Sequence, residues 1–342
     1  MELRALSRVF ALGILFLAGL LSGASRTLSA ADSVEIGGES FSFTKDAVIR
    51  GFDLPCRSFQ IWGDYYVGSG SISPKNLDGG YSFDTDLDGA QIGLNIGLGS
   101  AFLATIYYNY QGSELEADSE WGDSDFPSYL NKAKTHLGGI GLRYNTSGFY
   151  FSLIGNYGID DYDLTSYTYS ETETFSGLAE KKAGYDGWQA GGSFETGYMM
   201  STGLFDFKPF GNWQYSYLKA DGIDYKAAAY KDDKFGADAL FQTLGARIDV
   251  DFSLVTLQGR LGWVHQYLSS APINNYLFSR TSGTYTPSTC FFEGSSGSDY
   301  FWGGAGIKLS LFGTIAASLD YDVLLNHYQT THLGSVGLLW SF

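Results

Sequence analysis

The feature that most constrains this chain is a two-residue alternation of apolar and polar side chains, which runs from about residue 58 to the last residue. It is clearest in Thr314–Val323, where the odd-numbered residues are Ile, Ala, Leu, Tyr and Val and the even-numbered ones are Thr, Ala, Ser and two Asp. Successive side chains of an extended strand point to opposite faces, so this pattern requires a strand between two different environments. Similar segments predict twelve strands, near 58–68, 87–98, 101–112, 134–146, 148–160, 186–200, 203–218, 238–252, 254–268, 299–312, 314–325 and 331–342.

The links between these strands alternate in length. The short ones are Gly99-Ser100, Ser147, Ser201-Thr202, Ser253 and Gly313, and the long ones are roughly 69–86, 113–133, 161–185, 219–237 and 269–298. Short turns at one end and long loops at the other are typical of outer-membrane barrels. The sequence therefore predicts an all-β fold, a 12-stranded antiparallel up-and-down transmembrane β-barrel over residues 58–342, with both termini on the periplasmic side. Aromatic residues crowd the short turns, as expected at a membrane interface.

The two faces of the strands differ as a barrel wall should. One face carries apolar runs such as Ile92, Leu94 and Ile96, which we expect to meet lipid. The opposite face also carries Gln91, Asn212, Gln214, Asp249 and Gln258. The residues predicted to line the pore are Asp64, Asn95, Asn109, Arg143, Glu195, Lys208, Arg247, Arg260, Lys308 and Asp320.

Two features of this assignment have more than one interpretation. Glycines at 139, 141, 191, 197, 245, 304 and 306 fall on the inward face. They either leave the lumen roomy or ease strand twist and close backbone approach. Pro209 falls inside a predicted strand, where a ladder N–H is lost, so a bulge or a register error is expected there.

Composition excludes several other classes. Charged residues make up 17%, below the usual quarter of a soluble domain, and 37 acids against 21 bases exclude a phosphate-binding nucleic-acid protein. Two cysteines exclude a disulfide-stapled scaffold. Beyond the N-terminus no apolar run approaches the roughly 18 residues of a membrane helix.

The N-terminus reads as an export signal. Arg4 and Arg8 precede the 13-residue apolar run Val9–Leu21, and small residues then offer cleavage after Ala24 or Ala31. We assign 1–31 as a signal peptide and 32–57 as a short pre-barrel segment. A short helix over 45–50, capped by Thr44 and Gly51, would make this segment a pore plug; the alternative is an irregular lead-in.

The C-terminal strand ends in Val336, Leu338, Trp340 and Phe342 on one face. This resembles the signal by which outer-membrane barrels are recognised by the assembly machinery. Together with Ile61-Trp62-Gly63, Asp88–Leu94, Gly259–Tyr267 (a Trp-x-His-x-aromatic strand), Gly303–Gly306 and Asp320-Tyr321, the chain resembles the autotransporter β-domain, the translocator of type V secretion, over about 58–342.

The resemblance implies a barrel in the cell outer membrane, inserted by the barrel-assembly machinery, with a helix in the pore and an exported passenger. Only 26 residues, 32–57, lie between the predicted signal and the first strand, so we expect no passenger of its own. The Asn pair of self-cleaving members is also missing before Asn76. We therefore expect a monomeric translocator, pore or structural protein in contact with lipid and lipopolysaccharide. The alternatives are a porin-like diffusion channel and an outer-membrane hydrolase.

Little in the sequence points to chemistry. His136, His265, His327 and His332 show no catalytic spacing, and no enzyme activity, cofactor or metal is expected. Asp84, Asp86 and Asp88 copy the start of a calcium loop, but position twelve is Asn95. The acidic segment 113–125 reads as a solvated outer loop, or as a site for divalent ions that bridge to lipopolysaccharide phosphates. Cys56 and Cys290 fall at opposite ends of the barrel, so no disulfide is predicted.

Overall fold

The computed structural model describes residues 59–72, 81–99, 101–119, 129–172, 175–221, 224–225, 230–232, 235–279, 284–293, 298–311, 314–325 and 329–342. These residues form sixteen strands. No helix in this part of the chain is long and apolar enough to cross a membrane. The strands are β1 (Phe59–Ile72), β2 (Tyr81–Leu98), β3 (Phe102–Ser119), β4 (Tyr129–Thr146), β5 (Phe149–Thr172), β6 (Phe175–Tyr198), β7 (Met200–Ser201), β8 (Phe205–Ala220), β9 (Asp224–Tyr225), β10 (Tyr230–Asp232), β11 (Phe235–Asp251), β12 (Val255–Ser279), β13 (Thr284–Glu293), β14 (Ser298–Leu311), β15 (Ile315–Leu325) and β16 (Gln329–Ser341).

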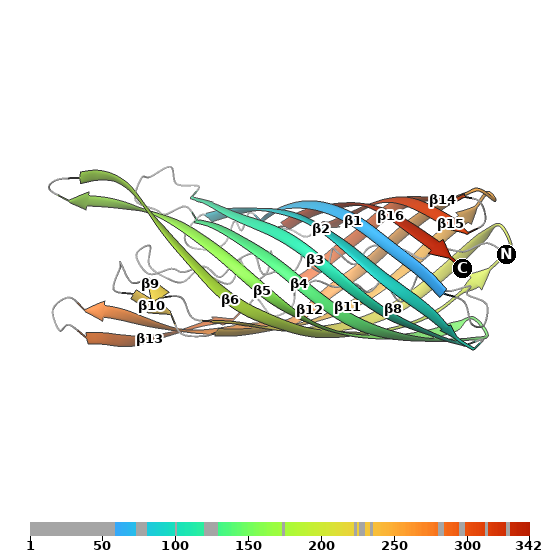
Figure 1. Cartoon of the computed structure of the whole chain (residues 1–342), viewed down its shortest axis with the longest axis horizontal. Helices are drawn as coiled ribbons and strands as arrows, with labels where there is room; N and C mark the ends of the chain where they lie inside the picture. The colour runs from blue at the N-terminus through green and yellow to red at the C-terminus, as the bar shows by residue number, and fades with distance from the viewer. Residues whose placement is uncertain are drawn as a thin grey trace.

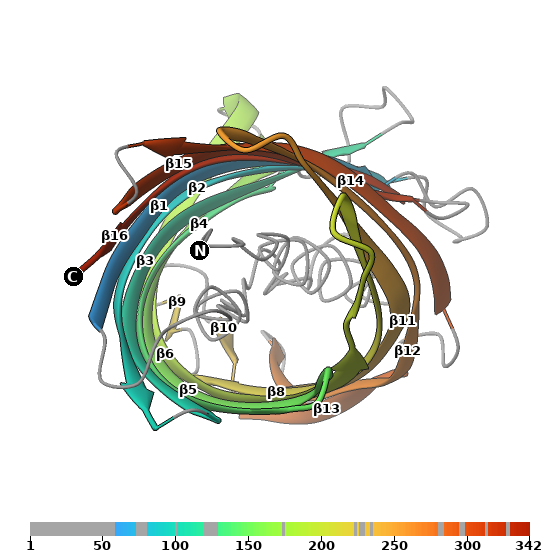
Figure 2. The ribbon, with the colours of Figure 1, turned by 90° about the vertical axis from the view of Figure 1, so that its right-hand side faces the viewer.

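Twelve long strands form a closed antiparallel barrel, which confirms the predicted fold class. Their order is β1-β2-β3-β4-β5-β6-β8-β11-β12-β14-β15-β16, and β16 returns to pair with β1, as in Gly63↔Leu338. Figure 1 shows the tilted strands from the side, and Figure 2 shows the closed wall in the view along the barrel. The closure removes the free strand edges that an open sheet would expose.

The two ends of the barrel differ as predicted. At one end, the turn end, tight links join β2 to β3, β4 to β5 and β11 to β12. Left-handed backbone makes these links short: φ is +76° at Gly99, +90° at Gly148 and +71° at Ser253, whose N–H donates to Asp251 Oδ1 at 3.2 Å. β1 begins and β16 ends at this turn end (Figure 1).

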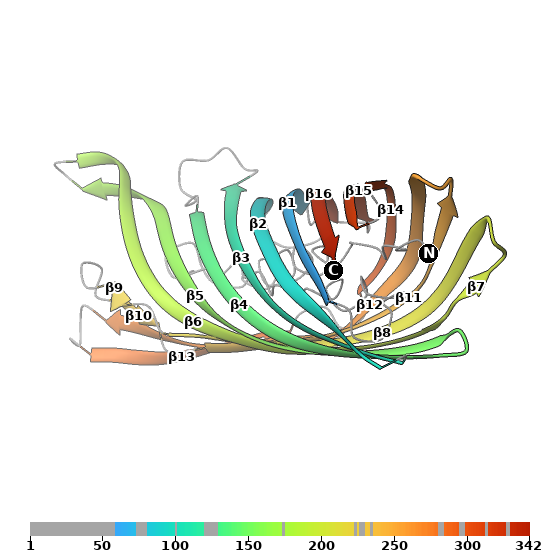
Figure 3. The same ribbon diagram turned by 45° about the vertical axis from the view of Figure 1, so that its right-hand side comes forward.

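The opposite, hairpin end corrects the sequence prediction. The segments 161–185 and 269–298 were expected to be loops, but β5 and β6 remain paired to Thr172↔Phe175, and β12 extends to Ser279 and pairs with β13. Short strands β9 and β10 add to the β12 side. These hairpins project beyond the rest of the wall (Figure 1, Figure 3). Runs rich in Tyr and Thr, such as 165–172, favour this continued pairing.

Two irregularities interrupt the ladders. The pairing on one side of β8 stops after Gly197↔Phe210 and resumes at Met200↔Phe207 without a change of register, so Pro209 lies opposite a gap. The prediction of a bulge or a register error at Pro209 is therefore wrong. A register shift occurs instead between β11 and β12, where Leu240 pairs with Leu268 and Phe241 with Gln266, so Tyr267 is the extra residue.

The alternation sorts side chains between the outside and the inside of the wall. Outward positions expose large apolar groups, among them Ile140 at 67%, Leu338 at 59% and Leu153 at 60%. Inward positions bury mostly polar groups. An apolar surface that surrounds the molecule is stable only in apolar surroundings, whereas the interior is polar.

Candidate functional site: the inner wall

All ten residues predicted to line the pore lie on the inner face and are at most 7% exposed. They come from ten different barrel strands, so no single loop builds this surface. The predicted pore-lining set omitted several members of the same wall, notably Tyr150 and Asp322. Both share the parity of inward neighbours, so the alternation itself could have identified them.

One buried ion pair, with the tyrosine hydroxyl that it contacts, joins three strands. Arg247 on β11 binds Glu195 on β6 at two points, Nη1–Oε1 at 2.9 Å and Nη2–Oε2 at 3.2 Å. The Tyr150 hydroxyl donates to Glu195 Oε1 at 2.9 Å and accepts from Arg247 Nη1 at 3.3 Å. The Arg247 guanidinium lies 3.8 Å from the Phe210 ring centre, and that of Arg143 lies 4.3 Å from the Tyr150 ring centre. Buried charges of this kind are tolerable only when paired and hydrogen-bonded.

A second pair lies near the turn end. Lys208 on β8 donates to Asp249 Oδ2 on β11 at 2.5 Å, and both side chains are buried. Gln258 on β12 donates to the other oxygen, Oδ1, at 3.4 Å. Lys208 and Asp249 are diagonal neighbours, two residues away from directly opposite positions, because Lys208 pairs with Arg247 and Asp249 pairs with Asp206.

A third cluster joins β12 to β15. Arg260 reaches Asp320 Oδ1 at 3.1 Å and Asp322 Oδ2 at 3.2 Å, and its Nη2 donates to the Ala305 carbonyl at 3.1 Å. The glycines Gly304 and Gly306 on the intervening β14 make this possible, because a Cβ on either would overlap one of the two aspartates. Lys308 follows on β14, fully buried.

The β1–β4 side of the wall is built differently, from amides and aromatic rings. Asn95 donates to Gln60 Oε1 at 3.3 Å and accepts from Trp62 Nε1 at 3.2 Å and from Thr105. Asn109 accepts from the Tyr66 hydroxyl at 3.0 Å, and Gln91 donates to Asp64 Oδ2 at 3.2 Å. Arg143 donates from Nε to Asn145 Oδ1 at 3.0 Å. The inner wall is thus largely neutral from β1 to β4 and rich in ion pairs from β6 to β15.

Several of the inward glycines have an aromatic ring directly above them. A Cβ on Gly139, Gly197 or Gly245 would meet the ring of Tyr107, Tyr150 or Phe210, and outside the predicted set Gly93 and Gly89 lie under Trp62 and Tyr66. Rings from one strand cover glycines of the next, which packs the wall and fixes the strand pairing. These positions fit the interpretation of close approach at glycine.

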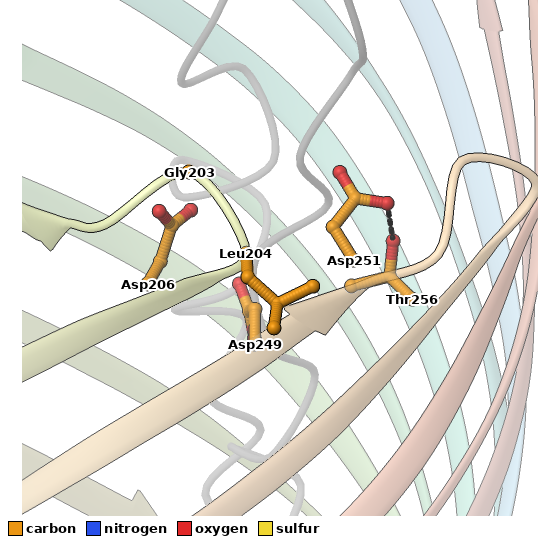
Figure 4. Close-up of a pocket in the computed structure, with 6 residues that line it drawn as sticks. All are labelled: Gly203, Leu204, Asp206, Asp249, Asp251 and Thr256. Atoms are coloured by element: carbon orange, nitrogen blue, oxygen red, sulfur yellow. Dashed lines mark hydrogen bonds between the residues drawn. The ribbon is translucent and has the colours of Figure 1, made fainter.

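A small pocket lies at the turn end (Figure 4). It is lined by Gly203, Leu204, Asp206, Asp249, Asp251 and Thr256. Its carboxylates already have partners: Asp249 binds Lys208, and Asp251 accepts from Ser253 N at 3.2 Å and Thr256 Oγ1 at 3.5 Å. No group of His, Cys, Asp or Glu suited to a metal ion occurs among the described residues.

The predicted assembly signal lies on the outer face at the turn end. Val336, Leu338, Trp340 and Phe342 are between 53% and 60% exposed. Phe342 closes the barrel against Phe59 through two backbone hydrogen bonds of 3.1 Å, and the two rings stack 6.2 Å apart. Recognition by the assembly machinery stays a prediction.

The remaining sequence candidates are placed as follows. Asp84, Asp86 and Asp88 lie along the paired strand β2. Within 113–125, residues up to Ser119 belong to β3, where Glu114 pairs with Lys132 at 2.8 Å on the exposed face. Cys290 lies in β13 of an extended hairpin, whereas residues 1–58, which include the predicted signal, the plug and Cys56, lie outside the described residues, as does His327.

Comparison with known proteins identifies the family. The model named Autotransporter beta-domain matches residues 61–322. Two extracellular serine proteases of Serratia marcescens match at 25% identity over 248 residues, 68% of this chain, and at 29% over 154 residues, 43% of it. The matched parts are only 23% and 14% of those proteins.

Solved structures agree on the fold. The translocator domain of the autotransporter NalP from Neisseria meningitidis has a TM-score of 0.65 at 14% identity, covering 87% of this chain and 93% of that one. The transport unit of AIDA-I from Escherichia coli gives 0.61 at 13%, covering 82% and 90%. The β domain of the Bordetella autotransporter BrkA gives 0.57 at 17%, covering 83% and 100%. The chain belongs to the autotransporter β-domain family, whose barrels lie in the outer membrane.

Proposed function

We propose that this barrel is a translocator pore that holds or passes an extended polypeptide across the outer membrane. The observation that carries the proposal is the inner wall, where charged side chains are buried in pairs across the strands, as in Arg247–Glu195 and Arg260–Asp320. A hydrophilic wall in which many of the charges are already paired would let segments of varied sequence lie against it without holding any one of them tightly. A site for one small solute would instead present a few unpaired polar groups to that solute.

The orientation follows from the difference between the two ends. Tight turns belong on the periplasmic side of outer-membrane barrels and long connections on the outside. The turn end is therefore proposed to face the periplasm, which places the start of β1 and the end of β16 there. Export by residues 1–31 belongs to the same proposal.

Segment 32–57 is proposed to occupy the pore, and the absence of a passenger of the chain's own stays a prediction. The test is single-channel conductance in planar bilayers, with the mature chain compared to a variant that lacks 32–57. We expect low conductance from the mature chain and a large, steady conductance from the deletion. A steady open pore in both proteins would favour the alternative, a diffusion channel of the same architecture.

We propose no catalytic role for the barrel. The matched relatives are named serine proteases as whole proteins, whereas the matched residues here belong to the barrel family. The described histidines face outward, away from the ion pairs of the inner wall. Hydrolase activity that is lost in His327→Ala would contradict this proposal.

A further inference from the structure

Three histidines lie on the outer face of the barrel, and no role assigned so far uses them. They are His136 on β4, His265 on β12 and His332 on β16. Each is an even number of residues from an exposed apolar side chain of the same strand: Ile140 at 67%, Leu261 at 53% and Val336 at 53%. The alternation of a strand therefore points all three imidazoles outward.

Each imidazole is held through Nδ1. The Tyr108 hydroxyl lies 2.6 Å from His136 Nδ1, and the Tyr321 hydroxyl lies 2.6 Å from His332 Nδ1. His265 Nδ1 lies 2.7 Å from Asp299 Oδ1, which also accepts from Trp263 Nε1 at 2.9 Å. Contacts through Nδ1 fix the ring and leave Nε2 as the nitrogen available to an external partner.

The strand register shows how the levels of these residues relate. Because the strands tilt, residues that pair across neighbouring strands lie farther and farther from the turn end on going from β1 to β8. Gln60 is the second residue of β1, and its successive pairing partners lead to Gln214, the tenth residue of β8. The partners in between are Asn95, Thr105, Gly141, Ile154 and Ser193. At a strand tilt of roughly 40°, the step from a residue to its pairing partner on the next strand changes the distance from the turn end by about one residue.

With this correction the three histidines share one level. From His136, four successive pairing steps toward the turn end lead through Tyr110, Ala90 and Tyr65 to Val336. His332 lies four residues farther from the turn end than Val336, so it lies at about the same level as His136. The ladder from Trp263 climbs in three steps, through Phe301 and Leu325, to Thr330. Since three strand steps correspond to about three residues, Trp263 lies slightly closer to the turn end than His332, and His265 lies slightly farther from it.

This level is the boundary of the apolar surface. Toward the turn end the outward residues are apolar, as in Ile140, Leu261 and Val336. Toward the hairpin end they become charged, as in Lys134 and Lys132 on β4. Aromatic rings pack beside the histidines, with Tyr110 centred 5.2 Å from His136 and Tyr267 4.5 Å from His265. Rings at such a boundary are typical of the headgroup region.

We propose that His136, His265 and His332 form a histidine belt that binds the phosphate groups of outer-leaflet lipids and does so more strongly as the pH falls. The proposal rests on the proposed orientation of the barrel. A protonated imidazole at the headgroup level complements a lipid phosphate in both charge and hydrogen bonding. Imidazole is the side-chain group that gains a positive charge as the pH falls from about 8 to 5.

The charged groups near each imidazole determine how much that histidine contributes to the pH dependence of lipid binding. The charged groups that face His136 are Lys134 on β4 and Asp161 on β5. The outward positions described on β15, β16 and β1 beside His332 carry no charge. His265 faces Asp299, which lies beyond the apolar face of β14, and its hydrogen bond holds the pKa of that carboxyl below the usual range. Asp299 balances a charge on His265, so His136 and His332 carry most of the pH response.

The test uses the full chain folded into phosphatidylcholine vesicles, with spin-labelled phosphatidylglycerol and phosphatidylcholine as probes. Phosphatidylglycerol keeps one negative charge between pH 5.5 and pH 8, so a pH effect must come from the protein. The preference for phosphatidylglycerol over phosphatidylcholine at the belt should be roughly fivefold higher at pH 5.5 than at pH 8. In the His136→Gln/His332→Gln variant this pH ratio should fall close to one.

A Lys132→Gln/Lys134→Gln variant is the matched control, because lysines stay charged at both pH values. It should lower the preference equally at pH 5.5 and pH 8 and so preserve the ratio. A wild-type ratio of one, or an unchanged ratio in the double histidine variant, would overturn the proposal. If the double variant fails to fold, the two single variants should each give an intermediate ratio, and unchanged ratios in both would also overturn it. Heat-dependent gel mobility reports folding separately, so failure of the belt is distinguishable from failure of the barrel.

Discussion

Arg247 on β11 and Glu195 on β6 form a two-point ion pair that passes over the intervening strand β8 inside the barrel. The nitrogen–oxygen distances are 2.9 and 3.2 Å, and both side chains are only 1% exposed. Tyr150 on β5 donates to the same carboxylate. The polar group therefore takes side chains from β5, β6 and β11 and spans the intervening strand β8. This cluster should therefore stabilise the wall as well as neutralise it.

Breaking the pair from one side should destabilise the barrel strongly. Either Glu195→Gln or Arg247→Gln leaves one buried charge uncompensated, which typically costs about 3–5 kcal/mol of unfolding free energy. The double variant should be more stable than either single variant, since no buried charge remains alone. Urea unfolding in vesicles, followed by heat-dependent gel mobility, measures these differences.

The exposed pair Lys132–Glu114 provides the control. Its nitrogen–oxygen distance is 2.8 Å, but the side chains are 52% and 43% exposed. Lys132→Gln should cost only about 0–1 kcal/mol, because solvent screens such a pair. Equal losses in Lys132→Gln and Arg247→Gln would show that the buried pair has no special weight.

Inward glycines covered by rings should not tolerate alanine. A Cβ on Gly139 would overlap Tyr107, and one on Gly93 would overlap Trp62. Gly139→Ala or Gly93→Ala should lower the unfolding free energy by about 1–3 kcal/mol, as overpacking does. Gly155, on the outer face, has no such neighbour within 4 Å. Gly155→Ala should therefore be close to neutral in the same unfolding assay, and losses of the same size at Gly155 and Gly139 would contradict the packing argument.

The sequence was most informative where lipid and lumen impose different side chains on the two faces. All twelve barrel strands were predicted, and boundaries at the turn end agree closely, as for β5, predicted from 148 and observed from Phe149. At the hairpin end the same strand continues twelve residues past its predicted end at 160. Beyond the apolar surface the outward side no longer needs apolar residues, so the alternation fades although backbone pairing continues.

The partners on the inner wall could not be predicted in the same way. Parity places Glu195 and Arg247 on the inner face, but their contact depends on the tilt of the wall and on an arginine long enough to pass β8. The glycines show the same limit, because Gly139 is explained only by the Tyr107 ring on the neighbouring strand. The alternation in a single sequence indicates which face of its own strand a residue lies on. It does not indicate which residue of the neighbouring strand lies opposite.

The C-terminal residue should matter more for assembly in cells than for the folded barrel. The backbone hydrogen bonds between Phe342 and Phe59 persist in Phe342→Ala, so folding from urea into detergent micelles should change little. If the terminal aromatic is read by the assembly machinery, the amount of folded protein in outer-membrane fractions should drop severalfold. Phe149→Ala, which removes another exposed ring at the turn end, is the control. Equal yields of the two variants in cells would contradict a specific role for Phe342.

The charges of the inner wall should set the ion preference of the opened pore. Lys208 and Lys308 are buried on the charged side of the wall, and removal of Lys208 leaves Asp249 without its cation. In the variant that lacks residues 32–57, Lys208→Gln and Lys308→Gln should each shift the reversal potential in a salt gradient toward cation selectivity, because fixed negative charge attracts cations into the pore. Lys132→Gln removes an equal charge from the outer face and should leave the potential unchanged. If all three substitutions give the same potential, ions do not pass along this inner wall.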